Sequence, residues 1–240
     1  MNPELLFKTG PYVSLGAFAL GMVVRCLFSR ERPATDARAS SGAGSRGRTL
    51  LRIGLALLLV GHLAGLLAPR WILTWNALPA RLYLLESTAF ASGTAALFGW
   101  AVLALRHLAR PVESAAADLA DTVFLSLLGV ALVAGLVSAA FYRWSSSWGV
   151  LTLTPYVLSL LRGKPLFGLA SQLPFPVQLH VAAALAAPAV APYTRLAPPL
   201  LARFRRAVVA LEAVGSAAAA AIGAFVLDHN PKRFIWPDED

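Results

Sequence analysis

Long apolar runs separated by short polar segments dominate the 240-residue chain. A run of about 17–25 apolar residues is long enough to cross the hydrocarbon core of a bilayer, about 30 Å thick, as a helix. The pattern therefore predicts an all-α, integral-membrane bundle of five transmembrane helices. No small-residue cleavage site follows the first run, so we expect it to stay as a span rather than be removed as a signal peptide. The five runs are Tyr12–Phe28, Leu50–Ala68, Leu82–Leu105, Thr122–Phe141 and Val177–Ala197.

A further apolar run, Ala207–Leu227, is long enough to span but consists mostly of alanine, which drives insertion weakly, and it carries Glu212. Its pattern leaves two interpretations open, a sixth span or a helix lying against the bundle. We therefore expect a transmembrane domain over residues 1–200 and a C-terminal extension over residues 201–240, made of this Ala-rich helix and a polar tail.

Composition agrees with a membrane protein. Hydrophobic residues make up 58% of the chain and charged residues 14%, against roughly 45–50% and about 25% in soluble domains. The mean hydropathy of +0.65 excludes almost any soluble enzyme. The single cysteine, Cys26, excludes an internal disulfide, a c-type haem attachment site, a four-cysteine iron–sulfur site and a thiolate zinc site.

The net charge of +9 is explained by membrane orientation rather than by nucleic-acid binding. Lys and Arg concentrate in the loops that remain on the inner side of a membrane. With the N-terminus outside and five spans, thirteen of them fall inside and six outside. The sequence thus predicts a multi-pass protein with its N-terminus outside. The Arg-rich, Lys-poor composition is typical of a GC-rich prokaryotic genome, so we expect the prokaryotic cell (inner) membrane.

Aromatic residues gather at the predicted outer side. Trp71 and Trp75 lie between the second and third runs, and Trp144 and Trp148 follow the fourth run. Tryptophan and tyrosine prefer the membrane–water interface. The stretch Val150–Leu161 that follows is a candidate for a short helix lying in this outer interface.

Two of the four histidines, His62 and His180, lie inside spans, where an ionisable group is costly and is by default a functional-site candidate. His62 lies seven residues before Pro69, and His180 four residues after Pro176. At about 1.5 Å per residue, they sit about 10 Å and 6 Å from the outer ends of their spans. Two imidazoles at similar depth on different helices match the axial ligation of a b-type haem.

Gly61 and Gly65 flank His62 and leave room for a flat macrocycle. The alternative is that each histidine only hydrogen-bonds a neighbouring helix. His107, beside Arg106 at the inner end of the third run, is expected at the interface, and His229 in the solvated tail.

Several local patterns resemble the respiratory nitrate reductase gamma subunit family, a five-helix cytochrome b. The second span carries a G-H-x-x-G-x-L-x-P-x-W pattern from Gly61 to Trp71. The resemblance covers about residues 10–200. Its other parts are Pro11-Tyr12, Ala120-Asp121-Thr122, Leu179-His180 and Pro192-Tyr193-Thr194-Arg195-Leu196.

The resemblance implies two b haems stacked across the membrane, each held by histidines of the second and fifth spans. The outer pair carries over to His62 and His180. The inner pair falls on Arg52 and Pro198, and neither can be an imidazole ligand. We therefore expect one b-type haem, near the outer face.

The resemblance also implies a subunit of an oxidoreductase complex that moves electrons between the quinone/quinol pool and a partner. A single outer haem leaves about 20 Å of the membrane core uncrossed. We therefore expect an iron–sulfur or other redox subunit on the extracytoplasmic side. The alternative is a redox-inactive membrane anchor. A third interpretation, a small transporter or channel, lacks support because the sequence shows neither a pair of broken helices nor a charged path through the bundle.

Glu86 and Arg81, near the outer end of the third span, are candidates for a quinone or proton site, because quinone chemistry needs a nearby proton acceptor or donor. The alternatives for Glu86 are an ion pair with Arg81 or a side chain that reaches the interface. The family's lysine at the quinone pocket has no counterpart between Tyr83 and Glu86.

Overall fold

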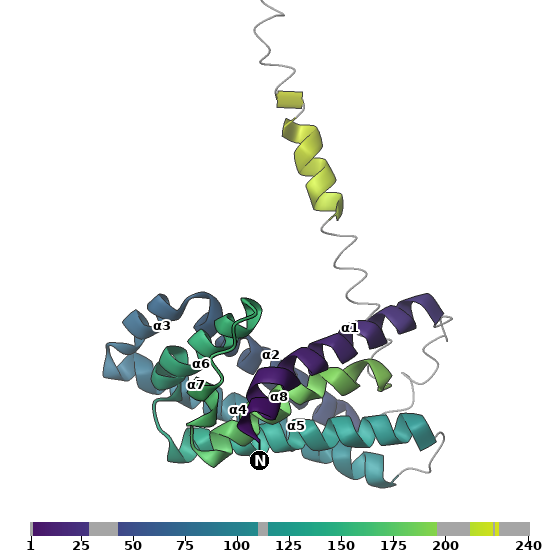
Figure 1. The fold of residues 1–240 in the computed structure, drawn as a ribbon, viewed down its shortest axis with the longest axis horizontal. Coiled ribbons are helices and arrows are strands. Elements are labelled where there is room, and N and C mark those ends of the chain that lie inside the picture. Colours follow the sequence, from purple (N-terminus) through teal and green to yellow (C-terminus); the bar gives the residue numbers. More distant parts are fainter. Residues whose placement is uncertain (1, 29–42, 110–114, 196–211, 223, 226–240) are drawn as a thin grey trace, which may run out of the picture. The chain divides into compact units, whose positions relative to one another are not determined.

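The computed structural model describes residues 2–28, 43–109, 115–195, 212–222 and 224–225. Contacts divide the chain into a first unit over Met1–Arg195 and a second over Leu196–Asp240, and each is described by itself. The described part of the first unit contains helices and no strand (Figure 1). Its helices are η1 (Leu5–Thr9), α1 (Gly10–Phe28), α2 (Ala43–Leu67), α3 (Pro69–Asn76), α4 (Pro79–Ala109), α5 (Ala115–Phe141), α6 (Ser145–Leu161), α7 (Gly168–Ser171), α8 (Phe175–Val190) and η3 (Ala191–Tyr193).

Among the described residues, five helices are long and apolar enough to cross a membrane, which confirms the predicted fold class. The observed boundaries differ from those of the apolar runs by up to seven residues, mostly because polar residues at the ends of a span remain helical. The third span is extended most, over all 31 residues of α4. The spans are Leu5–Arg25, Ser45–Leu67, Pro79–Ala109, Asp118–Phe141 and Phe175–Tyr193.

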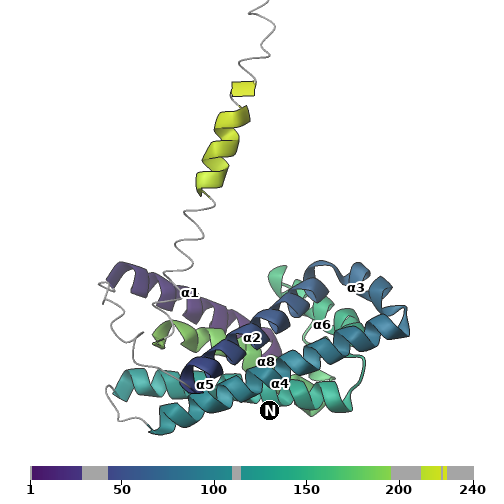
Figure 2. The same cartoon turned by 180° about the vertical axis from the view of Figure 1, so that it is seen from behind.

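The long helices pack in the spatial order α2, α4, α5, α8, α1. The shorter helices α3, α6 and α7 gather at one end of this bundle, on the left in Figure 1 and on the right in Figure 2. The predicted interfacial helix is part of α6, which packs on α3 and on the C-terminal part of α2. One end of the bundle is thus covered by short helices.

Small residues set the close approach of α2 and α4. A Cβ atom added at Gly54 would lie 2.5 Å from the Ser92 carbonyl oxygen, and one at Gly99 would overlap the Leu51 amide nitrogen. Real Cβ atoms do not approach other atoms so closely. Small residues let transmembrane backbones approach and gain van der Waals contact, the main source of helix association in lipid.

Two prolines each remove a backbone donor, and α6 supplies the replacement. In a regular α-helix the Gly65 carbonyl would accept from residue 69, which is Pro69 and has no N–H. The Thr154 hydroxyl donates to that carbonyl instead, at 3.1 Å. Likewise Pro11 cannot donate to the Phe7 carbonyl, and the Tyr156 hydroxyl does so at 2.9 Å.

The second unit has a helix over Glu212–Ile222 among its described residues. The remainder of Ala207–Leu227, apart from residues 224–225, lies outside the described residues, as does the tail from residue 226. Whether this run crosses the membrane therefore stays open, and the division at residue 200 stays a prediction.

Candidate functional site

The two histidines predicted as a pair face each other in the structure. His62 comes from α2 and His180 from α8, and their ring centres are 6.1 Å apart with an angle of 32° between the ring planes. His62 lies five residues before the C-terminal end of α2 at Leu67, and His180 lies five residues after the N-terminal end of α8 at Phe175. The similar depth predicted from the sequence is therefore matched by direct proximity.

Both imidazoles use the same ring nitrogen for a hydrogen bond. His62 Nδ1 lies 2.7 Å from the Leu58 carbonyl oxygen, and His180 Nδ1 lies 2.7 Å from the Ala131 carbonyl oxygen. A carbonyl can only accept, so Nδ1 carries the proton in both rings. In a neutral imidazole the lone pair is then on Nε2 and is available to bind a metal.

The spacing of the rings fits one iron between them. A metal–imidazole bond is about 2 Å long, so two rings with centres 6.1 Å apart could both hold the same metal atom. A Cβ atom at Gly61, the residue before His62, would meet nothing within 4 Å. No cluster of three or more His, Cys, Asp or Glu that could hold a metal ion occurs among the described residues. A porphyrin supplies four ligands itself, so two histidines suffice for a haem.

Sequence reasoning missed a third helix at this site. The Ala131 carbonyl that accepts from His180 belongs to α5, and a Cβ atom at Gly135 would lie only 2.8 Å from His180 Nδ1. The only signal was a glycine in the middle of the fourth span. A transmembrane glycine has many uses, so the sequence alone did not connect it with His180.

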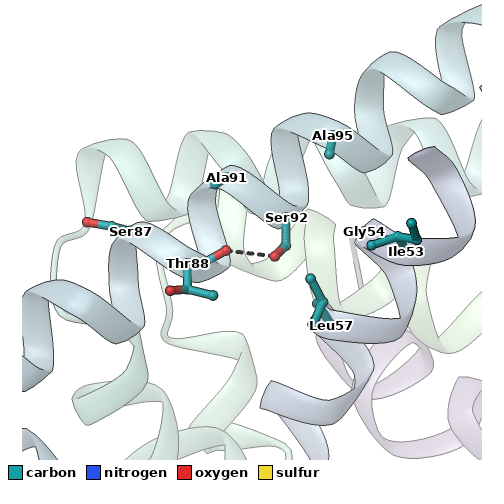
Figure 3. Close-up of a pocket in the computed structure, with 8 residues that line it drawn as sticks. All are labelled: Ile53, Gly54, Leu57, Ser87, Thr88, Ala91, Ser92 and Ala95. Carbon is teal, nitrogen blue, oxygen red and sulfur yellow. Dashed lines mark hydrogen bonds between the residues drawn. The ribbon is translucent and has the colours of Figure 1, made fainter.

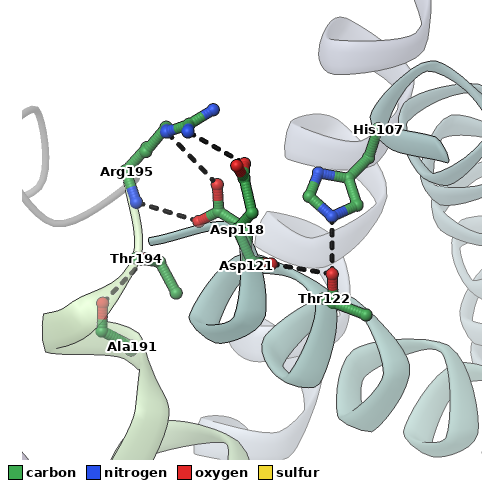
Figure 4. A network of polar contacts seen from close by, with 7 residues as sticks. All are labelled: His107, Asp118, Asp121, Thr122, Ala191, Thr194 and Arg195. Carbon is green, nitrogen blue, oxygen red and sulfur yellow. Dashed lines mark hydrogen bonds and ion pairs between the residues drawn. The ribbon is translucent and has the colours of Figure 1, made fainter. Parts of the chain in front are cut away.

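At the other end of the bundle, a polar network joins α5 to the segment after α8 (Figure 4). Arg195 bonds through its guanidinium to Asp118 at 2.8 Å and through its backbone amide to Asp121 at 2.9 Å. His107 Nε2 lies 2.7 Å from the Thr122 hydroxyl, far along α4 from the histidine pair. Two stretches that carried the resemblance are therefore in contact although 74 residues separate them.

Comparison with known proteins matches residues 3–205 to the model of the nitrate reductase gamma subunit family. The chain belongs to that family. A similar relative is the respiratory nitrate reductase 1 gamma chain of Escherichia coli (strain K12), 28% identical over 138 residues. The match covers 56% of this chain and 61% of the relative, so it spans about three fifths of that relative's length.

In this member of the gamma subunit family, Glu86 is bound to the start of α6. Its carboxylate accepts from the Ser146 backbone N–H at 2.8 Å and from the Ser145 hydroxyl at 3.2 Å. Arg81 is not its ion-pair partner, and its guanidinium instead lies 5.0 Å from the centre of the Trp75 ring. The suggested Glu86–Arg81 ion pair is thus wrong.

Two apolar grooves lie beside α4 in this gamma family member. One, of about 440 Å³, lies between α2 and α4 (Figure 3), and the other, of about 220 Å³, is lined by residues of α3 and α4. Thr88 lines both, and its hydroxyl bonds the Leu84 carbonyl of its own helix. The described walls therefore offer an apolar surface. The larger groove is lined by Ile53, Gly54, Leu57, Ser87, Thr88, Ala91, Ser92 and Ala95, and the smaller by Trp71, Ile72, Trp75, Leu84, Leu85 and Thr88.

Proposed function

We propose that the chain is a membrane cytochrome b subunit of an oxidoreductase complex, which holds one b-type haem and passes electrons between the quinone/quinol pool and a partner redox subunit. The observation that carries the proposal is the 6.1 Å separation of the His62 and His180 rings, with both Nδ1 atoms already donating. When bound, a haem supplies a one-electron redox centre whose potential depends on its axial ligands and their hydrogen bonds.

The residues of the site bind and orient. His62 and His180 each present Nε2, and the carbonyls of Leu58 and Ala131 hold the rings in that tautomer. The open space at Gly61 suits a flat ring system, and a Cβ atom added at Gly65 would meet only Val150, at 3.4 Å. We therefore include both glycines in the proposed haem site.

Packing below this site supports a single haem. Leu51, Leu55 and Leu58 follow His62 along one face of α2 towards its other end, at the spacing of one helical stripe. Leu51 packs in a closed apolar cluster with Ala96 and Leu132, and Trp100 packs against it. Arg52 is exposed, and Pro198 lies outside the described residues. This part of α2 is thus packed by apolar side chains and offers no imidazole for a second haem.

Charge distribution supports the proposed side of the partner. The excess of Lys and Arg on one set of loops favours an N-terminus outside, which places α3, α6 and the histidine pair near the outer face. A redox centre near that face serves a partner on the same side. We therefore propose an extracytoplasmic partner, an iron–sulfur or other redox subunit, and a location in the prokaryotic cell (inner) membrane.

Glu86 and Arg81 lie on α4 at that same end, and we propose that they form the quinone or proton site. Leu84 and Leu85, next to Glu86 in sequence, line the smaller apolar groove. A quinone has an apolar tail and a ring that exchanges protons, so an apolar groove close to a carboxylate suits it. The remaining outer surface of the spans contacts membrane lipid.

Haem stoichiometry tests the main proposal. We expect the wild-type chain, purified in detergent, to give one haem b per chain in a pyridine haemochrome spectrum, and His62→Ala and His180→Ala to lose it. His107→Ala is the matched control, because this histidine bonds Thr122 at the other end and should leave the haem content unchanged.

Two haems per chain would overturn the single-haem proposal. No haem would favour the second candidate, a redox-inactive anchor that only attaches a partner to the membrane. The missing inner histidines, at Arg52 and Pro198, are the observation behind that candidate.

A further inference from the structure

The His180 ring packs directly against the backbone of α5 at Gly135, which has no side chain. A Cβ atom at Gly135 would lie 2.8 Å from His180 Nδ1 and 3.0 Å from its Cε1. The first of these distances is shorter than real Cβ atoms show. Only glycine therefore leaves the imidazole its present position without a shift of α5 or α8.

The hydrogen bond of His180 comes from the same place on α5. Its acceptor is the Ala131 carbonyl oxygen, 2.7 Å from Nδ1, and Ala131 lies one turn before Gly135. Residues four apart lie on one face of a helix. The Ala131 carbonyl and the space at Gly135 thus lie on the same face of α5, and Ala131 is buried.

His62 has no comparable support from another helix in the described structure. Its Nδ1 bonds the Leu58 carbonyl of its own helix α2, and its side chain is exposed. A Cβ atom at the neighbouring Gly61 would meet nothing within 4 Å. The two histidines of the pair are therefore held differently, although they face each other.

We propose that α5 is a third structural part of the haem site, and that Gly135 with the Ala131 carbonyl forms a seat that fixes the ring position and tautomer of His180. This inference rests on the proposed haem-binding function. Gly135 is a positioning residue, because it acts through His180.

The seat has a defined chemical effect. Donation from Nδ1 to a carbonyl keeps the lone pair on Nε2, raises the basicity of Nε2 and sets the ring plane. The backbone carbonyl is neutral and cannot move independently of α5. Displacing the ring therefore changes haem affinity, reduction potential and the relative orientation of the two axial imidazoles.

The test is Gly135→Ala in the full chain, purified in detergent. We expect haem affinity to fall about 10–100-fold, the range for loss of a partner that orients a metal ligand. In the haem that remains, we expect a shifted midpoint potential and an altered low-spin ferric EPR signal, which reports the orientation of the axial imidazoles.

Gly129→Ala is the matched control on the same helix. Its added Cβ atom would collide with the Trp100 ring and does not approach His180, so it disturbs packing without touching the seat. Gly16→Ala, on α1, adds a methyl where nothing lies within 4 Å. We expect both controls to keep the wild-type EPR signal and midpoint potential.

A second variant serves if Gly135→Ala does not fold. Nδ1-methylhistidine in place of His180 removes the proton donated to Ala131 and puts a methyl group in the same narrow space. In place of His62, the same analogue removes the proton donated to the Leu58 carbonyl of its own helix, but the exposed His62 ring can turn away without meeting another helix. We expect the substitution at position 180 to lose about tenfold more haem affinity than the one at position 62.

Wild-type haem content, potential and EPR signal in Gly135→Ala would overturn the inference. Equal effects of Gly135→Ala and Gly129→Ala, or of the analogue at positions 180 and 62, would overturn it too. If the wild-type chain itself binds no haem, the proposed function fails first. If the wild type binds haem and Gly135→Ala is unaffected, only the proposal of the seat fails.

Discussion

At the scale of single residues, hydroxyl and carboxylate side chains form hydrogen bonds with backbone groups of other helices that have no partner within their own helix. Thr154 donates to the Gly65 carbonyl, which has no donor within its own helix because residue 69 is proline. Gly65 lies three residues after His62. Glu86 accepts from the first turn of α6. A buried polar group without a partner costs about 1–3 kcal/mol, so each contact matters to the helix end beside the histidine pair.

Thr154→Val removes the hydroxyl and keeps the shape of the side chain. We expect the free energy of unfolding to fall by about 1–3 kcal/mol, because the Gly65 carbonyl is left without its donor. Thermal unfolding in detergent measures the change. Thr152→Val is the control, since the Thr152 side chain makes no hydrogen bond within the described structure. Equal stability of the two variants would contradict the prediction.

Two substitutions distinguish a helix-capping role of Glu86 from a role in proton transfer. Glu86→Gln keeps an acceptor for the Ser146 N–H, and Glu86→Ala removes it, so only Glu86→Ala should lose the about 0.5–2 kcal/mol of a helix cap. If the carboxylate exchanges protons, Glu86→Gln should slow quinol oxidation about 100-fold or more. The rate of haem reduction by a quinol analogue in membranes measures this. A wild-type rate of haem reduction in Glu86→Gln would show that Glu86 only caps α6 and does not exchange protons.

At the scale of helices, α6 connects parts of the bundle that are distant in sequence. Tyr156 is fully buried in a cluster with Phe7 and Val177, and its hydroxyl bonds the Phe7 carbonyl across 149 residues. Tyr12 makes a second link, donating to the Leu160 carbonyl at 2.8 Å. The helix that the sequence predicts only as an interfacial segment thus fastens η1, α1 and α2 at one end.

Tyr156→Phe tests this fastening. Burial, with a smaller effect from Tyr12, raises the pKa of Tyr156 from 10.0 to about 12. A raised pKa in the folded state means that the stabilising neutral form is fully present below about pH 10 and is lost as the pH rises towards 12. We expect Tyr156→Phe to lose about 1–3 kcal/mol at pH 8, where the Phe7 carbonyl loses its donor.

The difference between wild type and Tyr156→Phe should then shrink between pH 10 and 12. Thermal melts of both proteins across this range measure it. A difference that is absent at pH 8 would show that the hydrogen bond does not hold α6 in place, and one that stays constant up to pH 12 would contradict the raised pKa of Tyr156.

At the scale of the whole molecule, five spans put the two ends of the bundle on opposite sides of the membrane. The histidine pair lies at the ends of α2 and α8 near α6, since Gly65, three residues after His62, bonds Thr154 of α6. The Arg195 network joins the start of α5 to the segment after α8, at the other end (Figure 4). The orientation decides which compartment the proposed haem serves. The excess of Lys and Arg predicts that the covered end faces outwards.

Cysteine labelling tests this orientation. In a background with Cys26→Ala, Arg162→Cys places a thiol after α6 at the covered end, and Arg46→Cys places one at the start of α2; both native side chains are exposed. We expect a membrane-impermeant maleimide to label Arg162→Cys in intact cells and Arg46→Cys only after permeabilisation. The reverse pattern would move the proposed partner to the inner side.

The sequence by itself determined the five spans, the all-α class and the similar depth of His62 and His180, because run length, helical rise and depth are properties of one segment at a time. It also carried the motifs that indicate the family. It did not determine what each side chain meets. An ion pair with Arg81, five residues away, was one alternative for Glu86, whereas its donors lie on α6, about sixty residues on.

Only the tertiary structure decided the roles of Gly135, Thr154 and Tyr156. Their partners lie 45 to 149 residues away, and no local pattern records such a contact. The physical reason is that lipid satisfies no backbone group, so a carbonyl freed by proline must find a donor on another helix. Which helix supplies it, and where a glycine makes room for an imidazole, depends on how the helices pack.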